Sequence, residues 1–202
     1  KRTGNVNEAE ILLSANKINL RHPEIKTTCL LSNISFNLYK GEILGVYGLM
    51  GAGRTELMET IFGLHPKNAS GEIFVEESVK KIKSPCDAIK AGIALVPEDR
   101  KLQGLILNQS VSKNISLTIL QQLQQWGIML SNTKEKALSL NYISRLGIKT
   151  SSGNNAAQNL SGGNQQKIVI AKWLATNPKI LLLDEPTRGI DINAKSEIYK
   201  LI

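Results

Sequence analysis

The sequence predicts an α/β protein in which a central sheet carries ligand-binding turns at its edge. Residues 180–183, ILLL, predict a buried strand that ends in Asp184 and Glu185, and an α/β sheet normally binds its ligand at the carboxyl ends of its strands. The run GLMGAGRT at 48–55 predicts a Gly-rich turn between a strand and a helix. LSGGNQQ at 160–166 predicts a second turn that opens a helix, where backbone N–H groups can hold an anionic oxygen.

The composition is that of an ordinary cytosolic protein with room for one substantial core and a small second lobe. No apolar run approaches the roughly 18–20 residues that span a bilayer. A net charge of +8 would suit nucleic acid, an anionic membrane surface or a polyphosphate. The charge is scattered, however, and aromatic residues are only 4%, which disfavours a platform for stacked bases. Cys29 and Cys86 are expected to be reduced thiols.

The amino-terminal part predicts a polar linker followed by antiparallel strands. Residues 1–9 are polar and read as the linker, and residues 10–46 hold short apolar runs. Apolar and polar residues alternate at 34–39, the period of a half-buried strand. Gly41 at a two-residue turn predicts a hairpin into a strand at 42–48.

A helix and a second hairpin are expected next. Residues 55–64 have helical spacing, with Gly63 as the stop. The expected buried face of this helix consists of Leu57, Ile61 and Leu64. Residues 71–83 then predict the hairpin.

The remaining sequence predicts a core interrupted by helices. Residues 91–100 contain a buried strand that ends at Pro97. From 101 to 158 the sequence becomes Gln-rich and helix-favouring, which predicts an inserted helical subdomain. We therefore expect residues 10–100 and 159–202 to form one core with an antiparallel β subdomain.

The Gly-rich turn has the composition of a phosphate-binding loop. Glycines allow a tight curl in which successive backbone N–H groups point at phosphate oxygens, and a strand before and a helix after are the context that such a loop needs. The candidate nucleotide-binding residues are Gly48, Gly51, Ala52, Gly53, Arg54 and Thr55. A plain turn between a strand and a helix is the alternative.

Arg54 stands where such loops usually carry the Lys that reaches the outer phosphates. A guanidinium is planar, forked and bulkier than an ammonium. The loop would therefore hold the nucleotide less well, or it would adjust and work normally. Thr55 supplies the hydroxyl expected to ligate Mg²⁺.

Asp184 and Glu185 are the candidate catalytic acids. They end an apolar run, a desolvated setting that strengthens charge interactions. Mg²⁺ prefers carboxylate, water and phosphate oxygens, which favours Asp184 as a metal ligand. Glu185 can then act as the catalytic base that polarises an attacking water. Two acids that merely cap a core strand are the alternative.

Ser161, Gly162 and Gly163 form the second candidate anion-binding turn. A serine followed by small residues at the start of a helix exposes backbone N–H groups to an anion. A helix N-cap with two flexible glycines is the alternative.

Taken in order, these motifs resemble the ATP-binding cassette of ABC transporters. GLMGAGRT stands at the Walker A position, LSGGNQQ at the signature motif, ILLLDE at Walker B and RGID at the D-loop. The resemblance covers residues from about 10 to 202. It implies a P-loop NTPase (RecA-like) core with an N-terminal antiparallel β subdomain and an inserted α-helical subdomain. It also implies that ATP and Mg²⁺ are bound and that ATP is hydrolysed.

A narrower resemblance is to the second, carboxyl-terminal cassette of bacterial importers of ribose, xylose or galactose. It is carried by GEILGVYGLMGAGRTELM, VPEDRKLQGL, NLSGGNQQKIVIAKWL and DEPTRGIDINAKSEIYKLI. It implies a peripheral protein at the cytoplasmic face of the inner membrane. The implied partners are a second cassette, membrane permease subunits and, indirectly, a periplasmic sugar-binding protein.

The family's mechanism accounts for two anion-binding turns in one chain. Two cassettes dimerise head to tail, and each ATP lies between one Walker A loop and the opposing signature motif. The resemblance thus implies that Ser161 and Gly163 contact the γ-phosphate of ATP held by the partner cassette. A permease helix is expected in a groove near Glu98 and residues 100–110.

Three features depart from the family pattern. Arg54 replaces the Walker Lys. Glu98 stands at the position of the Q-loop Gln, where a carboxylate could bind Mg²⁺ but would repel the γ-phosphate. The switch His and the strands that follow Walker B have no counterpart before Ile202, so the resemblance implies a truncated chain. We therefore expect a weak local site, poor ATPase activity of the isolated chain, and a signature motif that completes the partner's site.

Two other functions remain open at this point. One is a non-transport ABC ATPase that acts on ribosomes or DNA, which the charge of +8 supports. The other is a non-hydrolysing regulatory nucleotide-binding module. The sugar-importer segments favour transport, so we expect no nucleic-acid partner. The sequence does not name the sugar, because specificity in such systems lies in the periplasmic and membrane subunits.

Overall fold

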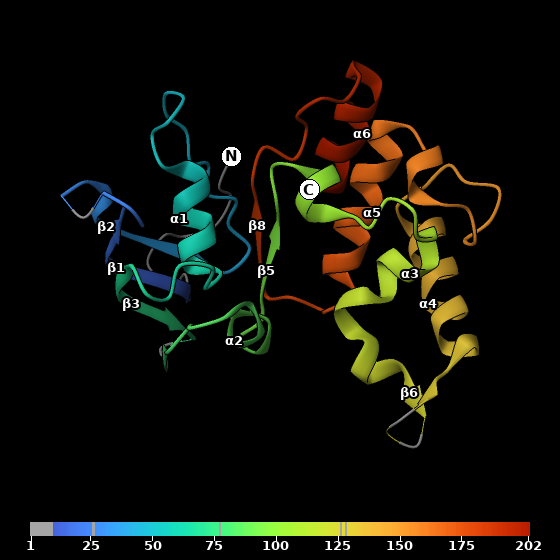
Figure 1. Ribbon diagram of the computed structural model, residues 1–202, viewed down its shortest axis with the longest axis horizontal. Helices are drawn as coiled ribbons and strands as arrows, with labels where there is room; N and C mark the ends of the chain where they lie inside the picture. The colour runs from blue at the N-terminus through green and yellow to red at the C-terminus, as the bar shows by residue number, and fades with distance from the viewer. Residues whose placement is uncertain (1–9, 26, 77, 126, 128) are drawn as a thin grey trace. The chain divides into compact units, whose positions relative to one another are not determined.

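The computed structural model describes residues 10–25, 27–76, 78–125, 127 and 129–202. The chain divides into two compact units, Lys1–Ile93 and Ala94–Ile202, which are described separately (Figure 1). The predicted linker at 1–9 lies outside the described residues. No helix in the described part of the chain is both long and apolar enough to cross a membrane.

The first unit is built on a four-stranded antiparallel sheet with the order β2-β1-β3-β4. Its elements are β1 (Ile11–Arg21), β2 (Cys29–Tyr39), α1 (Arg54–Ile61), β3 (Ala69–Val75), β4 (Ser78–Lys80) and α2 (Pro85–Lys90). Leu13 and Ala15 of β1 are buried, and so are Ile18 and Leu20 after a register shift near Lys17 (φ +50°). Alternate side chains of a strand share one face, so the segments of β1 before and after the shift both contribute side chains to the core. The predicted strands within 10–39 and the second hairpin are confirmed.

The strand predicted at 42–48 is wrong. The turn before it is present, because Gly41 has φ +71° and the Glu42 N–H donates to the Tyr39 carbonyl at 3.0 Å. The structure assigns no strand to residues 42–48, and the Tyr47 side chain is 96% exposed. A strand needs backbone partners, and the four strands of this unit pair with one another without this segment.

Helix α1 ends near the predicted stop. Gly63 has φ +82°, and its N–H donates to the Thr60 carbonyl at 3.1 Å. Leu57 and Ile61 are buried as predicted. Leu64 lies beyond the helix and is 46% exposed, so its predicted place on the buried face is wrong.

The second unit contains the paired strands β5 and β8 and a group of helices. Its elements are β5 (Ile93–Val96), η2 (Arg100–Gly104, a π-helical turn), α3 (Val111–Ser116), η3 (Leu117–Leu123, a 3₁₀ helix), β6 (Gln124–Gln125), β7 (Met129–Leu130), α4 (Asn132–Arg145), η4 (Ala157–Asn159, a 3₁₀ turn), α5 (Gly162–Leu174), β8 (Ile180–Leu183) and α6 (Ile192–Leu201). Helix α5, orange in Figure 1, contacts α3, α4 and α6. Its residues Ile168 and Val169 are fully buried, together with Val111 and Ile115 of α3. The helices of the predicted insertion thus share a core with the helix that begins at the second anion-binding turn.

Candidate active site

The Gly-rich turn of the first unit leads directly into α1. Gly51 and Gly53 adopt left-handed conformations, with φ of +78° and +82°, which favour glycine. A Cβ on Gly53 would lie 2.8 Å from Leu31 Cδ2 and 3.2 Å from the Leu30 carbonyl oxygen, so a side chain there would be crowded as well as strained. The Ala52 N–H donates to the Leu49 carbonyl at 3.1 Å. The turn therefore has the backbone curl that a phosphate-binding loop requires.

The start of α1 is suited to an anion. Its cap residue is Gly53, which has no side chain to accept a hydrogen bond from the first N–H groups. A Cβ on Gly48 would lie 2.9 Å from the Cβ of Ala52, so glycine allows the loop to fold back on itself. Arg54 and Thr55 form the first turn of the helix and are half-buried. A phosphate would meet the positive end of the helix here.

Asp184 and Glu185 begin the carboxylate loop (residues 184–189), which follows β8 in the second unit. The Asp184 N–H donates to the Val96 carbonyl at 3.0 Å, which extends the pairing of β5 and β8. Asp184 is only 4% exposed, whereas Glu185 is exposed and has φ +40°. A non-glycine residue in the left-handed region is uncommon, and such residues cluster at functional sites. One buried and one exposed carboxylate suit the different roles of a metal ligand and a base.

Glu98 comes next to the carboxylate loop because β5 and β8 are paired. Its carboxylate forms an ion pair with the Arg188 side chain. The two side chains are 27% and 61% exposed, so the pair contributes little to stability. It does orient Glu98 and offset its negative charge. Nothing in the sequence pattern around Arg188 indicated this cation.

Ser161 caps α5 and presents its hydroxyl at the surface. Its side chain does not bond to the helix backbone; instead its Oγ accepts a hydrogen bond from Asn164 Nδ2 at 2.9 Å. The Oδ1 of Asn164 in turn accepts the Lys149 N–H at 2.8 Å. The serine hydroxyl is thus oriented by a residue that the motif analysis missed, although Asn164 lies inside LSGGNQQ.

The two glycines of the turn make close approaches to other segments of the second unit. A Cβ on Gly163 would lie 2.5 Å from the Cβ of Ala194 on α6, and Gly163 is buried. A Cβ on Gly162 would lie 2.8 Å from Arg100 Nη2 and 3.4 Å from the Gly189 carbonyl oxygen. Gly163 is therefore required for packing, whereas a side chain at position 162 would displace the Arg100 guanidinium.

The second unit thus brings together Glu98, the carboxylate loop and the turn at 161–163. The Gly-rich loop belongs to the first unit, so Thr55 and Asp184, the two predicted Mg²⁺ ligands, are described separately. Within the described residues, no group of three or more His, Cys, Asp or Glu side chains is arranged to hold a metal ion. The predicted ligands are a hydroxyl and a carboxylate, a donor set that fits Mg²⁺ together with phosphate oxygens.

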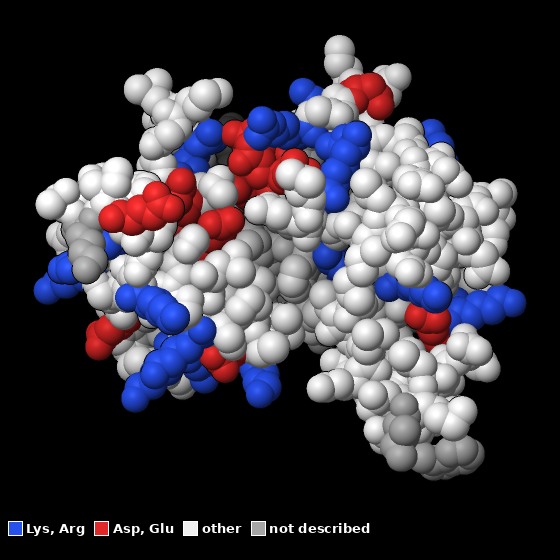
Figure 2. Space-filling model, in the orientation of Figure 1, with Lys and Arg blue, Asp and Glu red and all other residues white. Residues whose placement is uncertain are grey.

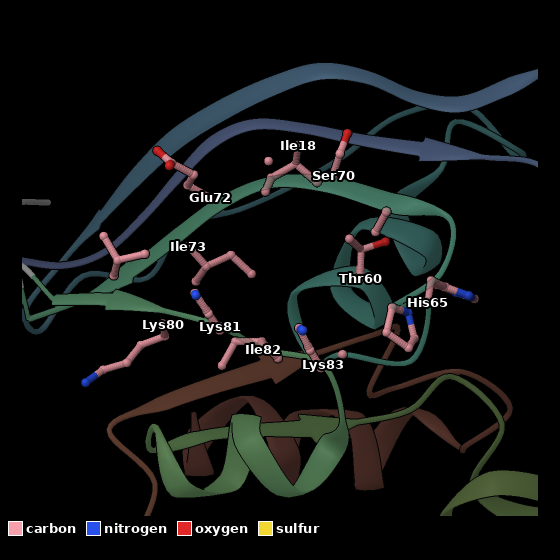
Figure 3. A pocket seen from close by; sticks show the side chains of 15 residues that line it. Ile18, Thr60, His65, Ser70, Glu72, Ile73, Lys80, Lys81, Ile82 and Lys83 are labelled. Atoms are coloured by element: carbon pink, nitrogen blue, oxygen red, sulfur yellow. The ribbon is translucent and has the colours of Figure 1, made fainter.

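A surface groove of about 420 Å³ lies elsewhere in the first unit, between the end of α1 and the β3–β4 hairpin (Figure 3). Its rim includes Lys81 and Lys83, both exposed, and its apolar floor includes Ile18 and Ile73. None of the predicted site residues lines it. On the face shown in Figure 2, Lys and Arg side chains lie dispersed among acidic ones, which is unlike the continuous basic surface of many nucleic-acid-binding proteins.

Comparison with protein families gives a match to the family described as "ABC transporter" over residues 31–188. Among known proteins, the chain is 48% identical to the ribose import ATP-binding protein RbsA of Rhodopirellula baltica over 95% of its length. It is 46% identical to the xylose import ATP-binding protein XylG of Thermoanaerobacter pseudethanolicus over 96% of its length. The chain spans only 37% and 38% of these two relatives.

Solved structures agree with the fold. The structure of cbiO1 from Clostridium perfringens, part of the ABC transporter complex cbiONQ, matches with a TM-score of 0.73 at 26% identity. The match covers 95% of this chain and 72% of that one. The dimeric ATP-binding cassette MJ0796, bound to ADP and Pi, matches with a TM-score of 0.76 at 22% identity, over 94% of this chain and 81% of that one. The fold class predicted from the sequence is confirmed by these likenesses.

Proposed function

This chain belongs to the ABC transporter family, and from that premise we propose that it is an ATP-binding cassette of a bacterial monosaccharide importer. The observation that carries the proposal is 46–48% identity to ribose and xylose import ATP-binding proteins across nearly the whole chain. Because the chain spans just over a third of those relatives, we further propose that it is one of two fused cassettes. The resemblance of its motifs favours the second, carboxyl-terminal one.

In the proposed reaction, the backbone N–H groups of residues 48–55 hold the phosphates of ATP. Thr55 and Asp184 would hold Mg²⁺, which when bound supplies positive charge that balances the phosphates. Glu185 accepts a proton from the attacking water or orients it. Its exposure gives it access to solvent, whereas the burial of Asp184 keeps that carboxylate fixed.

We propose that this local site is the weaker of the two in the assembled ATPase. The forked guanidinium of Arg54 replaces a compact ammonium at the loop. By its resemblance to the family pattern, Glu98 stands at the Q-loop Gln position, where a carboxylate would repel a γ-phosphate even though Arg188 pairs with it. Both features oppose tight binding of a γ-phosphate.

The turn at 161–163 would serve the ATP held by the partner cassette. The exposed Ser161 hydroxyl is oriented by Asn164, and the first N–H groups of α5 point away from the helix body. Gly163 is buried against Ala194, so its contribution would come from its backbone N–H. This turn at the start of α5 exposes Ser161 and suits an anion, which supports the proposal of a composite site.

Transport requires partners at the cytoplasmic face of the membrane. We propose that permease subunits dock near residues 100–110, where Leu102 and Ile106 are 85% and 44% exposed. A helix from the permease would cover these apolar side chains. A periplasmic sugar-binding protein would act through the permease and not touch this chain.

The complete transporter in lipid vesicles tests the proposal with two variants. Ser161→Arg places a bulky cation at the proposed composite site and should abolish most ATP turnover and sugar uptake. Glu185→Gln removes the base of the weaker site and should leave most of both. If Glu185→Gln abolishes turnover and Ser161→Arg does not, the division of roles is wrong. Absence of sugar-dependent ATP turnover in the unaltered transporter would contradict the function itself.

A further inference from the structure

Arg100 is the first residue of η2, and its guanidinium contacts the carboxylate loop. Nη1 donates to the Arg188 carbonyl at 2.8 Å and Nη2 donates to the Gly189 carbonyl at 3.1 Å. The same Nη2 lies 2.8 Å from the position that a Cβ on Gly162 would occupy. A single side chain therefore binds the carboxylate loop and lies close to the turn at 161–163.

The turn that carries Arg100 is itself fixed at both ends. Asp99 Oδ1 accepts the N–H groups of the two residues after Arg100, at 2.8 and 3.0 Å. At the other end, the Gly104 carbonyl accepts a hydrogen bond from the buried Lys172 Nζ of α5, at 2.5 Å. Arg100 is thus anchored to the helix that begins with the turn at 161–163. These hydrogen bonds fix the backbone that carries Arg100 relative to the turn at 161–163.

Arg100 also carries a feature that packing alone does not explain. Its Nε–H is buried and has no acceptor among the described residues. An unpaired buried donor destabilises a fold, and native structures keep few of them. Where local rules are broken, function is the usual reason.

The chemistry of the contact requires arginine. Its planar fork can donate to two carbonyl oxygens at once, whereas the single ammonium of lysine offers one compact head. The acceptors are backbone carbonyls of Arg188 and Gly189, so these hydrogen bonds do not require the Arg188 side chain. The Arg188 side chain adds a second connection between the carboxylate loop and the segment after β5, through its ion pair with Glu98.

We infer that Arg100 is a positioning residue that holds the carboxylate loop against the turn at 161–163, so that the two ATP sites of the assembled ATPase are linked. The inference rests on the proposed function, because it takes residues 161–163 as part of the partner's site. Arg100 acts through Glu185 on one side and through Ser161 on the other. Its guanidinium contacts backbone carbonyls, and it takes no part in nucleotide binding.

The complete transporter carrying Arg100→Ala tests this inference. The kcat for ATP should fall about tenfold to a hundredfold, because small misplacements of reacting groups have effects of that size. The KM for ATP should stay within about twofold, since no nucleotide contact is removed. Arg100→Lys should be intermediate. Arg145→Ala removes an exposed arginine at the end of α4 and is the matched control, with unaltered kinetics expected.

Two further measurements separate positioning from a general loss of structure. Guanidinium ion, added well below concentrations that unfold proteins, should restore part of the kcat of Arg100→Ala. Hydrogen exchange of the amides of residues 162–166 and 187–190 should accelerate together in that variant and in neither segment of Arg145→Ala. An unchanged kcat, a rise in KM without rescue, or unchanged exchange in both segments would overturn the inference. An unaltered transporter without sugar-dependent turnover would instead contradict the proposed function, and the exchange measurement would still decide the role of Arg100.

Discussion

The buried ammonium of Lys167 on α5 donates to the carboxylate of Glu197 on α6 at 2.7 Å and to the Gly147 carbonyl at 2.9 Å. The Lys167 side chain is 6% exposed, whereas that of Glu197 is 44% exposed. The hydrogen bond and charge of Lys167 lower the pKa of Glu197 below its usual value. The pair joins the helix that begins at the turn at 161–163 to the helix that follows the carboxylate loop.

Glu197→Gln is expected to lower the thermal unfolding midpoint at neutral pH, because it leaves the buried Lys167 cation beside a neutral amide. The folded-state pKa of Glu197 is depressed, so its contribution is present above the ordinary value of 4.5 and is lost as the pH falls through the folded value. The midpoints of wild type and variant should therefore differ at neutral pH and converge well below pH 4.5. Lys149→Gln is the control, since its exposed amine lies 3.8 Å from the other oxygen of Glu197. A difference that persists in acid would contradict this account.

Gly163→Ala is expected to destabilise the second unit. The added Cβ would lie 2.5 Å from the Cβ of Ala194, and overpacking of a core costs about 1–3 kcal/mol. Alanine gains up to about 1 kcal/mol in helix propensity over glycine, so the clash prevails. Urea unfolding should show the loss, and Ala194→Gly in the same chain should recover most of it.

Gly162→Ala provides the comparison for that experiment. Its Cβ would meet the end of the Arg100 side chain, which can shift more easily than a methyl group fixed to a helix. Its loss of stability should be smaller. A double variant of Gly163 and Ala194 as unstable as the single one would show that the close approach is not the cause.

Arg54→Lys is expected to strengthen ATP binding at the local site, by about tenfold or ~1.4 kcal/mol. The compact ammonium can reach the outer phosphates without displacing them. Titration of the complete ATPase with a nucleotide that reports binding measures the change, with Arg54→Ala as a weaker-binding reference. Equal affinities of wild type and Arg54→Lys would show that the loop already accommodates the guanidinium.

Lys172 gives a pH dependence of the same sense as that of Glu197, but in the alkaline range. Burial lowers its pKa from 10.5 to about 8. Between these two values the unfolded chain binds more protons than the folded chain, so the contribution of Lys172 to stability rises with pH. The free energy of unfolding of wild type relative to Lys172→Met should therefore increase from about pH 8 to 10.5 and be constant below that range. A difference independent of pH would place the charge of Lys172 in solvent.

Features with a local cause could be predicted from the sequence. The alternation at 34–39 predicted a strand that lies within β2, and Gly63 predicted the end of α1, because side-chain period and glycine conformation act over a few residues. The strand at 42–48 could not be judged in this way, since a strand depends on partners distant in sequence. Leu64 fitted the helical spacing, but it follows the Gly63 stop and therefore lies outside α1.

The candidate site shows the same division. The composition of the Gly-rich turn and of LSGGNQQ indicated where backbone N–H groups gather. The contacts of Arg100, Arg188 and Lys167 join segments far apart in the chain and leave no periodic pattern. Long-range contacts of this kind appear only once the fold brings their segments together.

The pairing of strands in the two units implies an order of assembly during synthesis. All four strands of the first unit's sheet lie within residues 11–80, so the sheet can form once Lys80 has emerged from the ribosome. Strand β5 must wait for β8 until the whole helical segment between them has been made. Closing so long a loop is slow and leaves apolar strand residues unpaired in the nascent chain. The carboxylates that follow β8 are thus the last part of the candidate site to be placed. The growing chain contains its Gly-rich loop well before it contains the carboxylates.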